Sequence, residues 1–249
     1  MWIGVITLFP EMFSRIEDFG VLGRAVKNGL VELDFFNPRD FALDNYKRVD
    51  DYSYGGGAGM VLKFETLEKA LKKAKESTPL ETKVVLMSPQ GATLIQDSAG
   101  ELSSEKGLIL VCGRYEGIDE RFIEKYVDLE ISIGDYVLSG GELPAMVLID
   151  VMSRHLPGVL GNSNSAIDET YIEGLFDYPH YTRPESVAGI DVPKELLSGD
   201  PIKVARFRRK QALIKTYDKR PALLAKHSLD AMDCEILKEH FESSLGDSA

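Results

Sequence analysis

The sequence predicts an α/β protein whose parallel sheet is covered on both faces, joined to a smaller helical segment. Short β-rich runs alternate with helical stretches up to about residue 155, a rhythm typical of parallel sheets. The polar run Gly161-Asn162-Ser163-Asn164-Ser165 then interrupts this rhythm and indicates a linker. Beyond Ile202 the pattern is helical to the end, so we place the domain boundary within 158–172.

Five β-rich runs predict the strands, at 2–9, 31–37, 83–87, 108–112 and 127–133. Pro10 stops the first run, Ser88-Pro89 ends the third, and Gly113 and Gly134 follow the last two.

Helices are expected between these strands, at 10–19, 22–28, 64–75, 93–102, 118–125 and 142–155. Pro10 suits the first turn of a helix, and Gly29 stops the second helix. Leu67, Leu71 and Ala74 fall on one side of the third helix, which predicts a face turned toward the core.

Composition excludes several classes of protein. The chain has 249 residues, 44% of them hydrophobic, which argues against wholesale disorder. Its two cysteines exclude a disulfide scaffold and a four-thiolate zinc site. No apolar run approaches the roughly 20 residues of a membrane helix, and the N-terminus lacks the basic region of a signal peptide. A cytoplasmic protein is therefore expected.

The basic residues are concentrated near the C-terminus, although the net charge is −11. Nine bases and two acids lie between Asp200 and Lys226, which gives this stretch a local charge of +7. Such a patch indicates either a contact for nucleic-acid phosphates or simply a solvated helix face.

Three expected strands end in loops rich in small residues, at 88–91, 113–117 and 133–141. In open α/β sheets, ligands bind beyond the carboxyl ends of the strands, where glycines let the backbone approach a ligand. One such loop can be a simple turn, whereas three together favour a binding site.

A glycine-rich run, Tyr54-Gly55-Gly56-Gly57-Ala58-Gly59-Met60, resembles a phosphate-binding loop only superficially. The Walker pattern needs Lys and Ser or Thr after the last glycine, and here Met60-Val61 follows. The dinucleotide fingerprint needs a preceding strand, and Asp50-Asp51-Tyr52-Ser53 is not expected to form one. An alternative interpretation of this run is a flexible lid near the site.

Acidic residues after the linker are candidates for proton transfer. Asp168 and Glu169 form an adjacent pair, which indicates a general base on a mobile segment or a solvated surface feature. His180 has no partner at metal-ligand spacing, so a packed or hydrogen-bonded histidine is expected.

Motifs along nearly the whole chain carry a family resemblance. They are Ile6-Thr7-Leu8-Phe9-Pro10-Glu11-Met12-Phe13, Gly23-Arg24-Ala25, Pro38-Arg39-Asp40, Val49-Asp50-Asp51, the Gly55–Met60 loop, Leu110 to Arg121, Ser132 to Pro144, Pro157 to Gly161 and Pro179 to Pro184. In these residues the chain resembles the bacterial tRNA (guanine-N1)-methyltransferase family (TrmD) of the SPOUT class.

The resemblance implies a deep trefoil knot in a catalytic domain at 1–160, a flexible linker at 161–172 and a small all-helical tRNA-binding domain at 173–249. It also implies an obligate homodimer with each active site at the subunit interface. S-adenosylmethionine would be held by residues of the three strand-end loops: Leu86, Ser88, Pro89, Gly113, Glu116, Ile133, Gly134, Asp135, Tyr136, Val137, Leu138, Gly140, Gly141 and Pro144.

The implied substrate is the guanine immediately 3′ of the tRNA anticodon, at position 37 of tRNA, with magnesium required. N1 of guanine carries a proton, so a carboxylate must remove it while a cation stabilises the charge that develops at O6. Arg154 matches the family's arginine. The chain departs from the family at the base: Glu169 occupies the place of the aspartate, and Asp168 lies one residue earlier. Register favours Glu169, and Asp168 stays open.

Three rival functions remain to be separated from this one. They are a SPOUT methyltransferase acting on another RNA, a catalytically inactive RNA-binding module, and a dinucleotide-dependent oxidoreductase. The absence of a GxGxxG motif after a strand argues against the third.

Overall fold

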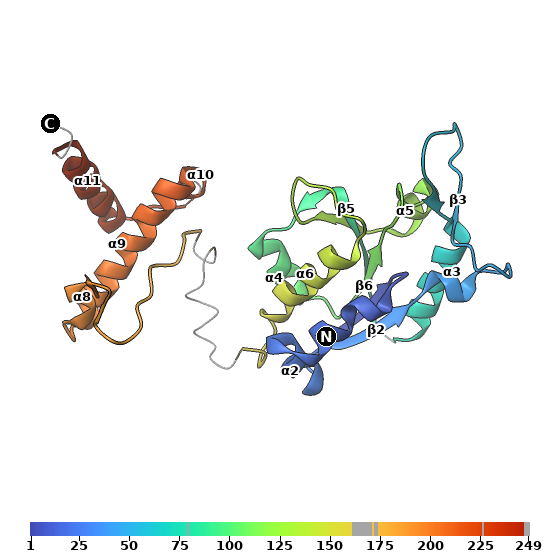
Figure 1. The fold of residues 1–249 in the computed structure, drawn as a ribbon, viewed down its shortest axis with the longest axis horizontal. Coiled ribbons are helices and arrows are strands. Elements are labelled where there is room, and N and C mark those ends of the chain that lie inside the picture. Colours follow the sequence, from blue (N-terminus) through green and yellow to red (C-terminus); the bar gives the residue numbers. More distant parts are fainter. Residues whose placement is uncertain (79, 161–170, 172–173, 226, 247–249) are drawn as a thin grey trace. The chain divides into compact units, whose positions relative to one another are not determined.

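The computed structural model describes residues 1–78, 80–160, 171, 174–225 and 227–246. The chain divides into two compact units, residues 1–163 and 164–249 (Figure 1). The division falls inside the linker expected at 161–172, of which only Tyr171 belongs to the described residues. Among the described residues, no helix is both long and apolar enough to span a membrane.

A five-stranded sheet forms the centre of the first unit. Its strands are β1 (Trp2–Ile6), β2 (Glu32–Phe36), β5 (Lys83–Thr93), β6 (Gly107–Cys112) and β7 (Leu129–Ser132). They lie in the order β2-β1-β6-β5-β7, and every pairing is parallel. The parallel α/β fold predicted from the alternating pattern is thus confirmed.

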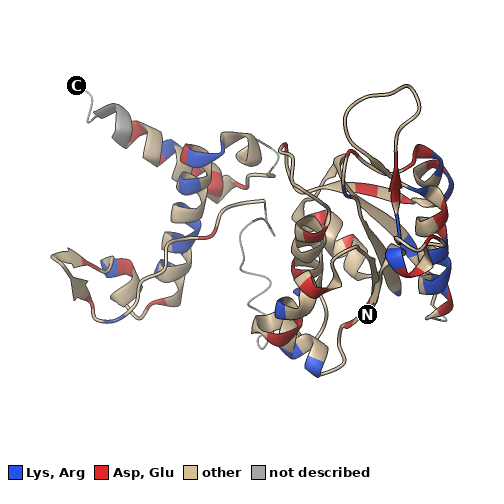
Figure 2. Cartoon of the chain, turned by 45° about the vertical axis from the view of Figure 1, so that its right-hand side comes forward, with Lys and Arg blue, Asp and Glu red and all other residues tan. Residues whose placement is uncertain are grey.

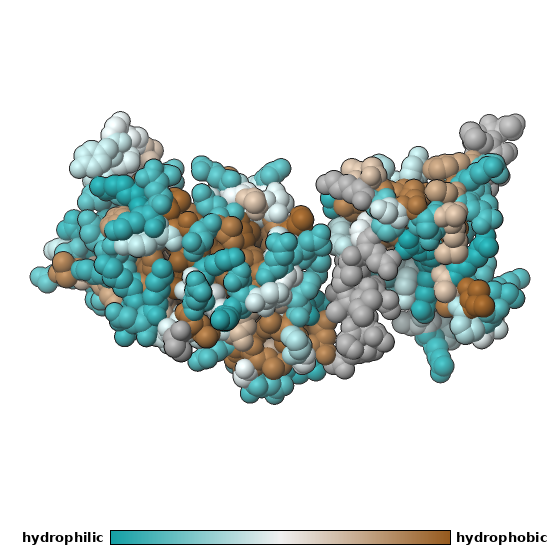
Figure 3. Space-filling view, turned by 180° about the vertical axis from the view of Figure 1, so that it is seen from behind, coloured by the Kyte–Doolittle hydropathy of each residue, from teal (hydrophilic) through white to brown (hydrophobic). Residues whose placement is uncertain are grey.

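Helices cover both faces of this sheet, because alternate residues of each strand point to opposite sides (Figure 1). One apolar cluster joins the sheet to α2 (Gly20–Lys27), α4 (Gln96–Ser103) and α6 (Glu142–Ser153). A second cluster on the other face joins it to α3 (Phe64–Glu76) and α5 (Glu120–Tyr126). The space-filling view shows hydrophobic residues exposed among hydrophilic ones on one face of this unit (Figure 3).

Several elements differ from the expectations. The helix expected at 10–19 begins as a 3-10 turn, η1 (Pro10–Phe13), and continues as α1 (Ser14–Asp18), with another turn at η2 (Pro38–Phe41). A short antiparallel pair, β3 (Asp50–Asp51) and β4 (Val61–Leu62), flanks the glycine-rich run. The expectation that Asp50-Asp51 is not a strand was therefore wrong, although this pair lies outside the parallel sheet.

The strand expected to end at Ser88-Pro89 continues through them to Thr93. Met87 and Ala92 both oppose Ile131 of β7, so residues 88–91 bulge out between two paired stretches. Pro89 is tolerated there because residues in the bulge are not paired in the ladder.

The second unit is mainly helical. It contains α8 (Lys194–Leu197), α9 (Pro201–Lys219), α10 (Pro221–Leu224) and α11 (Ala231–Gly246), together with the short hairpin of β8 (Ser186–Val187) and β9 (Ile190–Asp191). An all-helical unit was expected, so this hairpin is a difference. The small core of the unit consists of Leu175, Leu213, Leu224, Ile236 and Leu237.

Candidate active site

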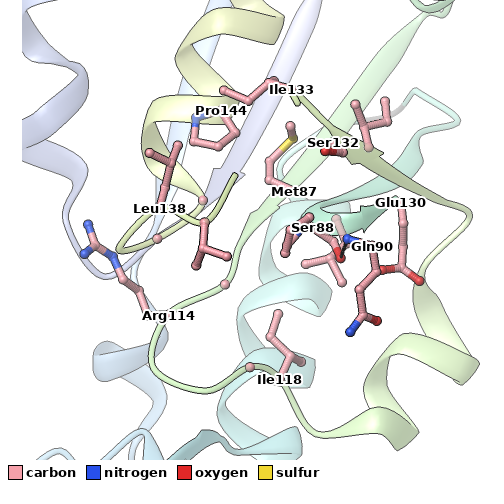
Figure 4. A pocket seen from close by; sticks show the side chains of 18 of the residues that line it. Met87, Ser88, Gln90, Arg114, Ile118, Glu130, Ser132, Ile133, Leu138 and Pro144 are labelled. Atoms are coloured by element: carbon pink, nitrogen blue, oxygen red, sulfur yellow. Dashed lines mark hydrogen bonds between the residues drawn. The ribbon is translucent and has the colours of Figure 1, made fainter. Parts of the chain in front are cut away.

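A cavity of about 350 Å³ lies at the carboxyl ends of β5, β6 and β7. Its walls are the bulge at 88–90, the loop after β6 at 113–118 and the loop at 133–141 that leads into α6. Figure 4 shows Leu138 and Pro144 on one side, Ile118 on another, and Gln90 and Glu130 at the edge away from Arg114. The cavity therefore occupies the place where open α/β sheets bind ligands.

The structure gathers the predicted cofactor residues around this one cavity. All of them line it except Asp135, which is exposed and lies outside the lining. The lining residues that had been predicted are Leu86, Ser88, Pro89, Gly113, Glu116, Ile133, Gly134, Tyr136, Val137, Leu138, Gly140, Gly141 and Pro144.

Other lining residues were not assigned individually to the cofactor, although Gln90, Arg114, Tyr115 and Ser139 lie within the three predicted loops. They include Met87, Gln90, Arg114, Tyr115, Ile118, Glu130, Ser132 and Ser139. Most are neighbours of predicted residues in the same loops, so adjacency was the available signal. Tyr115 has a positive φ of 62°, an uncommon conformation for a residue with a side chain.

Two glycines allow the 133–141 loop to lie directly against the end of β6. The Gly141 N–H donates a hydrogen bond to the Gly113 carbonyl over 2.9 Å. A Cβ on Gly141 would come within 2.7 Å of the Cα of Cys112, and one on Gly140 would overlap the Arg114 side chain. Only glycine permits this approach, which closes one wall of the cavity.

A buried carboxylate fixes the same corner of the cavity. Glu142, in the first turn of α6, is fully buried. Arg114 Nε donates to its Oε2 over 2.8 Å, and Thr7 Oγ1 donates to its Oε1 over 2.9 Å. Arg114 also donates to the Ser139 carbonyl over 3.1 Å, and its guanidinium lies 4.5 Å from the centre of the Phe9 ring. The pair thus ties β1, the loop after β6 and the 133–141 loop to the start of α6.

The glycine-rich run forms the loop between β3 and β4, next to the cavity wall. Gly55, Gly56, Gly57 and Gly59 all have positive φ, which suits glycine. The Glu116 N–H donates to the Met60 carbonyl, and the Leu62 N–H donates to the Gly117 carbonyl, each over 3.0 Å. The base of this loop is therefore bonded to the cavity loop, and its action as a lid stays a prediction.

Of the predicted catalytic residues, the structure describes Arg154, and it does not place Arg154 at this cavity. Arg154 is the C-cap of α6 and is not among the residues that line the cavity. Since a helix rises about 1.5 Å per residue, Arg154 lies roughly 20 Å from Gly141 along the same helix. Asp168 and Glu169 lie outside the described residues. His180 is hydrogen-bonded to Asp177 over 2.7 Å, which confirms the hydrogen-bonded histidine that the sequence predicts.

Acidic side chains of the same unit offset part of the positive charge of the basic stretch. Figure 2 shows Lys and Arg along α9 and acidic residues on α11. Arg209 pairs with the buried Asp233 over 2.7 Å and Arg206 with Glu239 over 3.4 Å. The Arg209 guanidinium holds the pKa of the Asp233 carboxyl below its usual range. These two bases are therefore paired with acids of α11, which offset part of the positive charge of α9.

The structure also describes the surroundings of Cys112 and of the side chains that could bind a metal. Cys112 is buried in the core, and burial raises the pKa of its thiol well above the usual range, so it is an inert core residue. Among the described residues, no group of three or more His, Cys, Asp and Glu side chains could hold a metal ion. The expected magnesium thus finds no site in this part of the chain.

The fold and the cavity define a class: an α/β protein with a backbone-lined ligand site at the carboxyl edge of a parallel sheet. The tRNA (Guanine-1)-methyltransferase TrmD family matches residues 1–226, so the chain belongs to that family of enzymes. It is 53% identical to a tRNA (guanine-N(1)-)-methyltransferase of Shewanella piezotolerans over 243 residues, 98% of both chains. It is also 53% identical to the enzyme of that name from Escherichia coli O127:H6 (96% of this chain, 94% of the relative). The corresponding figures for Chromohalobacter salexigens are 52% identity, 96% and 92%.

Proposed function

We propose that the protein transfers a methyl group from S-adenosylmethionine to N1 of the guanine immediately 3′ of the anticodon in tRNA. The observation that carries this proposal is the cavity built from the bulge of β5 and the glycine-containing loops after β6 and β7. These are the segments that the family resemblance assigns to the methyl donor, and together they line one cavity.

The residues of the cavity suit the methyl donor. The wall formed by Gly113, Gly140 and Gly141 offers backbone groups to the polar edges of an adenosine. Leu138, Pro144 and Ile118 supply apolar surface for the flat base (Figure 4). When bound, S-adenosylmethionine supplies a methyl group on a positively charged sulfur, which is an electrophilic carbon.

Proton removal is the step that the protein itself must perform. Guanine N1 attacks the methyl carbon, the bond from that carbon to sulfur breaks, and the N1 proton passes to a carboxylate. We assign this carboxylate to Glu169 on register, with Asp168 as the alternative. Arg154 would stabilise the negative charge that develops at O6.

The active site would form between two copies of the chain. Arg154 lies at the C-terminal end of α6, whereas the cavity lies at its N-terminal end. Within one subunit, α6 therefore holds Arg154 away from the cavity. The half-exposed Leu143 and Val147 lie one turn apart on α6, and Val137 is exposed beside the cavity. A homodimer in which this apolar surface is paired would bury it and place Arg154 of one subunit near the cavity of the other.

The knot belongs to the same proposal. The 133–141 loop follows β7 on one side of β5 and is hydrogen-bonded at Gly141 to Gly113, which follows β6 on the other side of β5. This crossing between strands on either side of β5 is the arrangement that supports a trefoil knot closing around the cavity.

The second unit would hold the tRNA through the basic residues of α9 that are not paired within the unit. A tRNA-modifying enzyme meets its substrate in the cytoplasm, which is the location we propose.

Methyl transfer to defined transcripts tests this function. The purified protein is incubated with methyl-labelled S-adenosylmethionine and an unmodified tRNA transcript that carries guanine 3′ of the anticodon. We expect label in that transcript and none in a matched transcript with adenine at this position. Equal labelling of both would favour another RNA site, and tRNA binding without labelling would favour the inactive binding module.

A further inference from the structure

The second unit contains a cavity of its own, with a volume of about 820 Å³. Its walls are the extended segment 178–185, the residues around α8, and the N-terminal half of α9. We call it the α9 pocket and define it by Tyr178, Tyr181, Arg183, Leu196, Val204 and Arg208. The volume falls within the range of about 300–1,000 Å³ that is usual for small-ligand sites.

The wall of the α9 pocket combines flat rings with a guanidinium. The guanidinium carbon of Arg208 lies 4.6 Å from the centre of the Tyr178 ring, which in turn contacts the His180 ring at 4.8 Å. Tyr181 keeps 44% of its surface exposed. Arginine planes and tyrosine rings are the groups on which proteins stack unpaired RNA bases.

Charge distinguishes Arg208 from its neighbours on α9. Arg206 and Arg209 are paired with Glu239 and Asp233. Arg208 and Arg183 have no ion-pair partner among the residues that the structure describes, and both line the pocket. One acid, Glu185, lies with them, so the pocket wall has a net positive charge that suits a phosphate.

The floor of the α9 pocket is apolar. Val204 projects from α9 one turn before Arg208, and Val192 and Leu196 come from the opposite wall; all three are half-buried. An apolar floor with a stacking wall and cations at the rim fits one nucleotide better than a helical RNA backbone, which offers no flat face.

We infer that the α9 pocket binds a single unstacked nucleotide of the tRNA, with its base against Arg208 and Tyr181 and its phosphate near Arg183. This inference rests on the proposed function, because it names a contact of the same tRNA away from the reacting guanine. It predicts that the flat guanidinium of Arg208 contributes to tRNA binding in addition to its positive charge.

Charge-preserving variants test the inference. We would measure the affinity of the full-length protein for the unmodified tRNA transcript after Arg208→Lys, Arg208→Ala and Tyr181→Ala, with Lys238→Ala on α11 as control. Arg208→Lys keeps the charge but loses the flat guanidinium, so it should weaken binding at least about fivefold, close to Arg208→Ala. The control should stay within about twofold of wild type.

A direct contact can be mapped in the same protein. A tRNA transcript with 4-thiouridine in its single-stranded regions is photocrosslinked, and the adduct is located by peptide mass spectrometry. We expect crosslinks at Tyr181 or its neighbours in segment 178–185. Wild-type affinity in Arg208→Lys and Tyr181→Ala, or crosslinks confined to other segments, would overturn the inference.

Three outcomes separate this inference from a pocket occupied by a second copy of the chain and from the proposed function itself. If wild-type protein methylates tRNA and the pocket variants bind it normally, the pocket is not a nucleotide site although the proposed function stands. If sedimentation shows that Tyr181→Ala changes the oligomeric state, a second copy of the chain occupies the pocket and the inference fails. Failure of the wild-type protein to bind or methylate tRNA would instead refute the proposed function.

Discussion

Glu142 anchors one corner of the cavity through its pairing with Arg114, which lines the cavity. It is fully buried and accepts hydrogen bonds from Arg114 and Thr7. Glu142→Gln removes the charge that pairs with Arg114, so we expect a loss of about 3 kcal/mol in the free energy of unfolding. Affinity for S-adenosylhomocysteine should fall about tenfold, because the 133–141 loop loses its anchor.

Urea denaturation and isothermal titration calorimetry measure these two effects. Glu124→Gln, an exposed glutamate on α5, is the matched control and should change neither quantity. Unchanged ligand affinity in Glu142→Gln would show that Arg114 and Glu142 stabilise the fold without positioning the cavity.

The two acids after the linker can be separated by amide substitutions. Glu169→Gln removes the carboxylate that stands in the base's register, so turnover should fall about 100-fold or more while tRNA affinity is kept. Asp168→Asn should have a much smaller effect on single-turnover rates. Equal mild effects in both variants would reject both residues as the base.

For single residues, the loops that line the cavity were easier to predict from the sequence than the side-chain pairs that hold them. Backbone-lined loops at strand ends have a local signature, and the cavity contains them. The pairing of Arg114 with Glu142 has no such signature, because it depends on the 133–141 loop returning to β6. Asp135 differs from its neighbours, because its loop lines the cavity while Asp135 itself is not a lining residue, and its contact with the cofactor stays a prediction.

Among the elements, the loop into α6 depends on glycine at position 141. A Cβ there would meet the Cα of Cys112 at 2.7 Å, which is backbone and cannot move aside easily. Gly141→Ala should therefore lower stability by about 1–3 kcal/mol and weaken cofactor binding. Thermal unfolding with and without S-adenosylmethionine measures both.

Gly100→Ala in α4 serves as the control for this substitution. Its Cβ would meet only the His155 ring at 3.5 Å or more, so stability should be equal or slightly higher. A Gly141→Ala protein as stable as wild type would contradict the close packing of the two loops.

The packing of α11 on α9 should depend on pH through Asp233. Because Arg209 lowers the pKa of Asp233 in the folded protein, the pair contributes stability that is fully present above the ordinary carboxyl pKa of about 4. This stability is lost as the pH falls through the lowered pKa. Hydrogen exchange resolved to α9 and α11, compared between wild type and Asp233→Asn, should show a smaller acid effect in the variant. Parallel pH profiles in the two proteins would refute the role of the pair.

Element prediction succeeded where local pattern and tertiary pairing agree. The five strands and the helices that cover them are present, because β-rich runs and amphipathic repeats carry their own signals. The continuation of β5 through Pro89 could not be predicted, since it depends on Ala92 and Thr93 pairing with β7. The β8–β9 hairpin has two residues per strand, which are too few to show the alternating hydrophobic pattern that predicts a strand.

For the whole molecule, the proposed active site requires two chains to be complete. A chain with Arg154→Ala and a chain whose cavity is blocked by Gly113→Phe should each be inactive as homodimers. Purified mixed dimers carrying two different tags should recover about half of the wild-type activity, because one of their two sites then has an intact cavity and an intact arginine. Inactive mixed dimers would place both groups in the same chain.

The most direct test of the central claim identifies the methylated atom. After reaction with S-adenosylmethionine and the unmodified transcript, the RNA is digested and its nucleosides are separated against standards of 1-methylguanosine, N2-methylguanosine and 7-methylguanosine. We expect 1-methylguanosine alone, in the oligonucleotide that contains the guanine 3′ of the anticodon. Either of the other two isomers, or 1-methylguanosine elsewhere in the tRNA, would contradict it.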